Sequence, residues 1–78
     1  MFIIQALYES DKKPAKDKRV AISVDGLFTG GISHEEWTDS NGKVSIDVGN
    51  REYVQGKIYV DGRMKYEGYV DKFRVIYI

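Results

Sequence analysis

The stretch Thr38-Asp39-Ser40-Asn41-Gly42-Lys43-Val44-Ser45-Ile46-Asp47-Val48 joins a tight turn to an alternating strand. Asn and Gly accept positive φ more readily than other residues, so Asn41-Gly42 predicts a two-residue hairpin turn. From Val44 to Val48 every second residue is apolar, which places the apolar side chains on one face and the polar ones on the other. The stretch therefore predicts a β-hairpin with one buried face.

The register of this hairpin follows from the turn. If Asn41-Gly42 forms the two central positions, Trp37 lies opposite Ile46 on the buried face, and Thr38 points outward. Trp37, the one tryptophan of the chain, is therefore expected in the core. The side chain of Asp39 is expected to cap the turn.

The same two-residue period recurs along the chain, and no apolar pattern of helical spacing is long enough for a surface helix. We expect one domain over residues 1–78, a small antiparallel Greek-key β-sandwich of about six or seven strands, with a small SH3-like or OB-like barrel as the alternative. Besides the strand after Asn41-Gly42, the predicted strands include Phe2–Tyr8, Arg19–Val24, Ser33–Asp39, Val54–Val60 and Phe73–Ile78.

A second turn is predicted at Asp61-Gly62. A two-residue turn continued as a plain ladder would set apolar residues against charged ones, so the buried face would be broken. A three-residue loop or a bulge removes this conflict, because Val60 then lies opposite Met64. In that register Ile58 lies opposite Tyr66.

Composition narrows the function classes. Twelve basic and twelve acidic residues cancel, which argues against the broad positive field of a nucleic-acid or anionic-membrane binder. The absence of cysteine excludes a disulfide framework and a thiolate zinc site. No segment approaches the roughly 20 apolar residues of a membrane span, and the apolar start lacks the basic lead-in of a signal peptide. A cytoplasmic location without a membrane partner is the default expectation.

No group of residues predicts catalysis or metal binding. His34 is the one imidazole, no nucleophile motif accompanies it, and it is interpreted as a surface residue. The run that starts at Asp39 resembles the opening of a calcium loop, but Asn50 stands where a bidentate Glu is required. Gly30-Gly31 does not connect a strand to a helix, so no phosphate loop is predicted. We therefore expect no enzyme and no cofactor.

Basic residues gather in and next to the loop between the first two predicted strands: Lys12, Lys13, Lys16, Lys18 and Arg19. Lys13, Lys16 and Arg19 are candidate contacts to nucleic-acid phosphates, with Tyr8 near enough to stack on a base. The neutral net charge favours a second interpretation, in which the loop is solvated and its lysines discourage edge pairing.

The last strand is apolar on both faces, with Phe73, Val75 and Tyr77 on one side and Arg74, Ile76 and Ile78 on the other. Tyr59 and Tyr69 are out of phase with their core-facing neighbours. With Ile76 and Ile78 they are expected to form an outward patch that suits a protein partner, a homodimer or a sugar ring. The competing interpretation is that the tyrosines cover a small sheet.

The run Lys13-Pro14-Ala15-Lys16-Asp17-Lys18-Arg19-Val20-Ala21-Ile22, followed by the turn region Trp37–Ile46, resembles the carboxypeptidase regulatory-like and bacterial Ig-like domains of prealbumin type. In those families a proline-led loop precedes a Val-rich strand, and a Thr-Asp-x-x-Gly turn starts the next. The resemblance implies a Greek-key sandwich used for structure or recognition, and no catalytic residue. The later segment Gly56–Gly62 departs from the families' usual Gly-x-Tyr ending.

The leading hypothesis is a non-enzymatic structural or protein-interaction module, with either a different protein or a second copy as partner. The alternatives are a small nucleic-acid-binding β-barrel that uses the loop at residues 12–19, and a carbohydrate-binding module.

Overall fold

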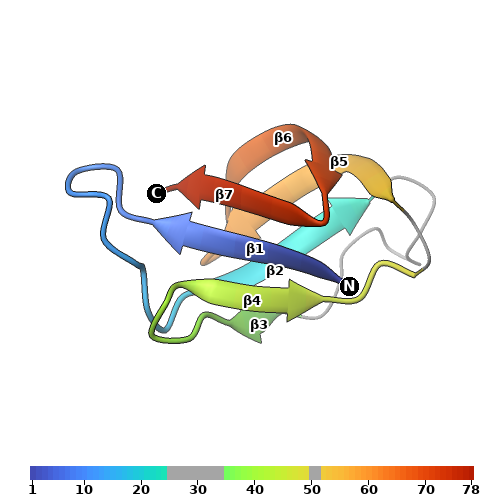
Figure 1. Ribbon diagram of the computed structural model, residues 1–78. Helices are drawn as coiled ribbons and strands as arrows, with labels where there is room; N and C mark the ends of the chain where they lie inside the picture. Colours follow the sequence, from blue (N-terminus) through green and yellow to red (C-terminus); the bar gives the residue numbers. More distant parts are fainter. Residues whose placement is uncertain (25–34, 50–51) are drawn as a thin grey trace.

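The computed structural model describes residues 1–24, 35–49 and 52–78, and this part of the chain forms seven strands and no helix (Figure 1). No described segment is therefore a helix of the length and apolarity that a membrane crossing requires. The strands are β1 (Phe2–Leu7), β2 (Arg19–Val24), β3 (Glu36–Trp37), β4 (Lys43–Ile46), β5 (Tyr53–Val60), β6 (Arg63–Asp71) and β7 (Phe73–Tyr77).

The strands form two sheets, one of three strands in the order β4-β1-β7 and one of four in the order β3-β2-β5-β6. Figure 1 shows the three-stranded sheet in front of the four-stranded one. The predicted all-β class and the two-sheet arrangement of a small sandwich are confirmed. Four of the five strand pairs among the described residues are antiparallel, as predicted, and one departs from that pattern, since β1 and β7 run parallel. These strands are the first and last of the chain, so the long connection that parallel strands need is present.

The core lies between the sheets and follows the alternation in the sequence. Each strand that contributes to it turns every second side chain inward, as the period of two requires. The strand predicted at Arg19–Val24 is confirmed with the same bounds. The buried core residues are Phe2, Ile4, Ala6, Ala15, Val20, Ile22, Val24, Val44, Ile46, Val48, Val54, Ile58, Val60, Val70 and Ile76.

The turn before β4 differs from the prediction by one residue. The N–H of Asp39 donates to the carbonyl of Lys43 (3.1 Å), and the N–H of Gly42 donates to the carbonyl of Asp39 (2.9 Å). Three residues rather than two therefore separate the paired positions, and Gly42 takes the left-handed conformation at φ +75°. A Cβ at Gly42 would lie 2.4 Å from the carbonyl oxygen of Ala6, so this position requires glycine.

A register change of one residue moves every side chain of the preceding segment to the other face. Thr38 accordingly points inward and is 3% exposed, while Trp37 points outward and is 62% exposed. The predicted core position of Trp37 is wrong. The predicted hairpin is wrong as well, because β3 pairs with β2 and the turn carries the chain from one sheet to the other.

The predicted cap of this turn is confirmed. The Oδ1 atom of Asp39 accepts hydrogen bonds from the N–H groups of Asn41 (2.8 Å) and Lys43 (3.0 Å). These two bonds, with that from Lys43 the stronger influence, hold the pKa of Asp39 below its ordinary value.

Of the two alternatives that the sequence left open for the hairpin of β5 and β6, a three-residue loop or a bulge, the structure has the bulge. Asp61 and Gly62 have φ of +51° and +81° and form a two-residue turn, and a bulge follows between Ile58 and Tyr59. The expected pair Val60–Met64 is wrong, and the expected pair Ile58–Tyr66 is confirmed. The observed pairs are Val60–Arg63, Tyr59–Met64 and Ile58–Tyr66.

Candidate interaction surface

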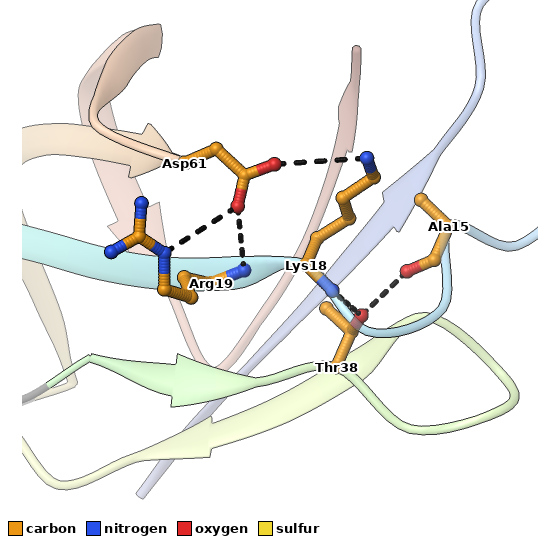
Figure 2. A network of polar contacts seen from close by, with 5 residues as sticks. All are labelled: Ala15, Lys18, Arg19, Thr38 and Asp61. Carbon is orange, nitrogen blue, oxygen red and sulfur yellow. Dashed lines mark hydrogen bonds and ion pairs between the residues drawn. The ribbon is translucent and has the colours of Figure 1, made fainter.

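The start of β2 is held by an acidic side chain from the turn between β5 and β6 (Figure 2). The Asp61 carboxylate accepts a hydrogen bond from the N–H of Arg19 (3.1 Å) and lies 3.7 Å from Arg19 Nε and 3.6 Å from Lys18 Nζ. The backbone bond from Arg19, followed by the charges of Lys18 and Arg19, lowers the pKa of Asp61. Arg19 also lies 3.8 Å from the carboxylate of Glu35.

Thr38 connects two segments by hydrogen bonds: the lysine-rich loop between β1 and β2, and the turn before β4. Its Oγ1 donates to the carbonyl of Ala15 (2.6 Å) and accepts the N–H of Lys18 (2.9 Å), as Figure 2 shows. The N–H of Thr38 in turn donates to the carbonyl of Lys18 (2.9 Å). Because both ends of the hydroxyl are used and the side chain is buried, this contact serves the fold rather than a ligand.

The three proposed phosphate contacts, Lys13, Lys16 and Arg19, have different surroundings. Arg19 is shared between two carboxylates, whereas Lys13 and Lys16 are exposed positions of the loop. The Lys18 ammonium lies 5.9 Å from the centroid of the Tyr8 ring and covers the aromatic residue that was expected to stack on a base.

A shallow hollow of about 410 Å³ lies beside this loop. Two of its cations, Arg63 and Lys65, come from β6 and were not predicted as candidates, because the packing of the two sheets, which the sequence does not show, places them in one hollow with Tyr8. Its full lining is Tyr8, Lys18, Val60, Asp61, Arg63, Lys65 and Ile78.

The outward patch expected around Tyr59, Tyr69 and Ile76 does not form. Tyr59 and Tyr69 belong to β5 and β6, on the outer face of the four-stranded sheet. Ile76 belongs to the other sheet, points into the core and is 2% exposed. Its assignment as a binding residue is wrong, because the face of β7 that carries Arg74 and Ile76 is the inner one.

The outer face of the four-stranded sheet mixes tyrosines with charge pairs. Tyr69 packs edge to face against Tyr53, with ring centroids 5.7 Å apart and planes at 71°. Lys57 lies 3.9 Å from Glu67 on the neighbouring strand. Two aromatic rings at a steep angle do not offer one flat platform to a sugar, so carbohydrate binding stays a prediction.

The outer face of the three-stranded sheet carries apolar side chains on two adjacent strands, interrupted on β1 by Gln5. Phe73 is 47% exposed and Tyr77 is 49% exposed, and they stand on the same side of β7. The register between β1 and β7 places Ile3 beside Phe73 and Leu7 beside Tyr77. We call this surface the apolar face; it consists of Ile3, Leu7, Phe73, Val75 and Tyr77.

Two lysines border the apolar face. The Lys12 ammonium lies 4.6 Å from the centroid of the Tyr77 ring, and the Lys43 ammonium lies 5.7 Å from that of Phe73. Both are cation–π contacts, which hold a positive charge at the border of the rings. No outward position of β4, β1 or β7 carries a carboxylate.

The sequence contained the signal for this surface. The last strand was correctly described as apolar on both faces. The face of Ile76 was expected outside, whereas the face of Phe73, Val75 and Tyr77 is the outer one. The first strand also has apolar residues on both faces, since Ile3 and Leu7, with Gln5 between them, lie on the face opposite the buried Phe2, Ile4 and Ala6. Two such strands that pair must leave one apolar face outside a two-layer fold.

Within residues 1–24, 35–49 and 52–78, no three metal-ligating side chains gather at one point. His34 and Gly30-Gly31 lie outside these ranges. No protein-family model, no curated protein and no solved structure matches this chain. The resemblance to domains of prealbumin type therefore stays a prediction, and the function must be inferred from the surface itself.

Proposed function

We propose that this protein is a non-enzymatic interaction module that binds another protein through the apolar face. The observation that carries the proposal is the exposure of Ile3, Phe73 and Tyr77, with the half-buried Leu7 and Val75 between and beside them, on the outer face of one sheet. Contiguous exposed apolar surface on a small domain is typical of a contact site. Burial of one such side chain contributes about 1.5–3 kcal/mol, so a few of them can supply most of a binding energy.

The charge at the border defines the partner further. Lys12 and Lys43 stand at the rings of Tyr77 and Phe73, whereas Glu52 and Asp71 share a hollow with Phe73. A partner with apolar side chains bordered by charges of both signs complements this surface. Such charges at the rim of an interface raise the association rate and select the partner more than they add affinity.

The test compares the outer faces of the two sheets. Immobilised wild-type protein and two double variants are exposed to the same cell extract, and the bound proteins are quantified. Phe73→Ser with Tyr77→Ser alters the apolar face; Tyr53→Ser with Tyr69→Ser is the matched control, because it removes two exposed rings from the other sheet. An amide NMR spectrum of each variant confirms that the fold is retained.

We expect a set of proteins that the wild type and the control variant retain and the Phe73/Tyr77 variant loses. Equal retention by all three would contradict binding through the apolar face. Loss in both variants alike would point to general aromatic stickiness and would equally contradict the proposal.

A second candidate function is phosphate binding, favoured by the hollow that brings Lys18, Arg63 and Lys65 beside Tyr8. Binding of a labelled oligonucleotide should then be salt-sensitive and should fall in Arg63→Glu with Lys65→Glu. Charge reversal at Lys13 and Lys16 is the control for the loop alone. If neither double variant binds more weakly than the wild type, this candidate fails.

A further inference from the structure

The four edge strands of the sandwich differ in how they are protected against pairing with another strand. β3 has only two residues. In β4 the carbonyl of Lys43 is already engaged by the N–H of Asp39. β6 contains a bulge and four charged side chains, namely Arg63, Lys65, Glu67 and Asp71. Short length, bulges and charge are the usual means by which edges avoid pairing.

β7 has little of this protection. It runs for five residues in regular register with β1, without proline or glycine, and Arg74 is its one charged residue. Arg74 points inward, where its guanidinium lies 4.1 Å from the centroid of the Tyr66 ring. An inward charge can itself discourage pairing, but this one is engaged by the ring and leaves the edge uncovered.

The backbone of β7 also has free groups on this edge. The carbonyl of Lys72 accepts a hydrogen bond from β1, and the N–H of Ile78 donates to β1, each at 2.9 Å. In a parallel ladder, residues at two-residue spacing face the same neighbour, so the groups between these two ends alternate. The N–H and C=O of Phe73, Val75 and Tyr77 therefore face away from β1, and among the described strands β7 has no second neighbour.

We propose that β7 of one copy of this chain pairs antiparallel with β7 of a second copy, about a two-fold axis through Val75. The inference rests on the proposed interaction role and names a second copy as the partner at the edge of the same strand. The three-stranded sheets of the two copies would then join into one continuous sheet.

The sequence of β7 is self-complementary about Val75. Phe73 lies opposite the partner's Tyr77, so the aromatic rings pair across the strands on the apolar face. Arg74 lies opposite the partner's Ile76, so like charges do not face each other. Val75 lies opposite the partner's Val75.

Charges of both signs stand at the ends of β7. The Lys12 ammonium lies over Tyr77 at the end of the strand, and Asp71 and Lys72 precede Phe73 at its start, where Lys72 lies 3.2 Å from the carboxylate of Glu52. Antiparallel pairing sets the end of one strand beside the start of the other, which brings Lys12 towards a partner region in which Asp71 and Glu52 outnumber Lys72. With a net charge of zero, the two copies have no overall repulsion to overcome.

The experiment uses the full chain in sedimentation from micromolar to millimolar concentration. Wild type, Val75→Lys, Val75→Glu and an equimolar mixture of the two variants are compared. Because residue 75 faces itself across the axis, each variant alone should raise the dimer dissociation constant at least about tenfold, and the mixture should recover the dimer.

A second pair of variants tests the backbone. Val75→Pro removes the N–H that would bond the partner but none that bonds β1, so the monomer fold should persist in amide NMR spectra. Val75→Thr keeps both the N–H and the branched shape. We expect the proline variant to be monomeric and the threonine variant to form the dimer.

A wild type that stays monomeric at millimolar concentration overturns the inference. So does a mixture of Val75→Lys and Val75→Glu that associates no better than either alone, or a Val75→Pro variant that dimerises like the wild type. A monomer that still captures proteins through Phe73 and Tyr77 refutes the dimer alone, whereas a dimer that captures nothing refutes the recognition of other proteins alone.

Discussion

The two sides of the sandwich are closed by different chemistry. On the β3–β4 side, where the chain passes from β3 to β4, a buried hydroxyl and a capped turn join the sheets. There the Thr38 hydroxyl and the Oδ1 atom of Asp39 each have two hydrogen-bond partners. On the β6–β7 side, β6 curves until its end reaches the start of β7 (Figure 1). There the Arg74 guanidinium stacks on the Tyr66 ring, and Arg74 Nε is buried without a hydrogen-bond partner.

The difference separates residues that hold the fold from residues that are available for binding. Buried polar groups that are fully satisfied fix one arrangement, because any change leaves one of them unpaired. A stacked cation tolerates small shifts. The apolar face and the free edge of β7 both belong to the β6–β7 side. On that side the contacts between the sheets depend less on exact hydrogen-bond geometry.

The largest effect is expected at Gly42, on the β3–β4 side. Gly42→Ala would combine the left-handed strain with a Cβ 2.4 Å from the Ala6 carbonyl, which accepts the N–H of Ala15. We expect a loss of about 3 kcal/mol or more in urea unfolding, from about 1–2 for the conformation and the rest for the displaced backbone bonds.

Gly62→Ala is the matched control for this prediction. Gly62 has nearly the same φ, +81°, but nothing lies within 4 Å of its Cβ position. It should therefore lose only the conformational part, about 1–2 kcal/mol. Equal losses in the two variants would show that the approach of Gly42 to β1 does not matter for stability.

Thr38→Val should come next. The valine keeps the shape but leaves the carbonyl of Ala15 and the N–H of Lys18 without their partner, which costs about 2–3 kcal/mol. Thr38→Ser keeps the hydroxyl and loses one methyl, about 0.8 kcal/mol. A valine variant as stable as the serine variant would show that the hydrogen bonds of Thr38 do not stabilise the β3–β4 side, and would contradict the comparison.

Arg74→Met should have a smaller effect than either. The change removes the cation–π contact with Tyr66 but also the buried Nε that has no partner, so stability should stay within about 1 kcal/mol of the wild type. The measurement is again urea unfolding. A loss as large as that of Thr38→Val would mean that both sides are held by equally specific contacts.

The sequence predicted the fold well because alternation is a local property. The strand at Arg19–Val24 and the buried face from Val44 to Val48 both follow from side chains on alternate faces. Both turns were also located, since Asn-Gly and Asp-Gly accept positive φ.

Turn length was harder to predict than turn position. Asn41-Gly42 was expected to form a two-residue turn and lies in a three-residue loop. For Asp61-Gly62 a three-residue loop or a bulge was expected, and the structure has a two-residue turn with the bulge after the pairs Val60–Arg63 and Tyr59–Met64. Each loop length is compatible with the same turn residues, and contacts distant in sequence decide between them. A difference of one residue then moved Trp37 out of the core.

The sequence predicted the type of the candidate site, an exposed apolar surface, but not the residues that form it. An exposed apolar surface on the last strand is present, and it is made by Phe73, Val75 and Tyr77 instead of Ile76. Both faces of this strand are apolar, so its pattern alone cannot say which one is buried. The pairing with β1 decides, and that pairing joins the two ends of the chain.

The smallest effect should appear in acid, and it should be confined to places where a carboxylate is used. The pKa values of Asp39 and Asp61 are both lowered in the folded state, so their stabilisation is complete above the ordinary aspartate pKa of about 3.9 and is lost as the pH falls through the folded values. Unfolding free energy should therefore decline below about pH 4, and Asp39→Asn should decline less steeply.

Amide NMR can assign this decline to one side of the sandwich. As Asp39 takes up a proton, the N–H signals of Asn41 and Lys43 should shift together, because both donate to its Oδ1. Signals of β7 should not follow the same titration, since the hydrogen bonds that Asp39 Oδ1 accepts come from the turn before β4 and from the first residue of β4. If they do follow it, the two sides are coupled, and the division between a polar side that holds the fold and an apolar side that binds would have to be abandoned.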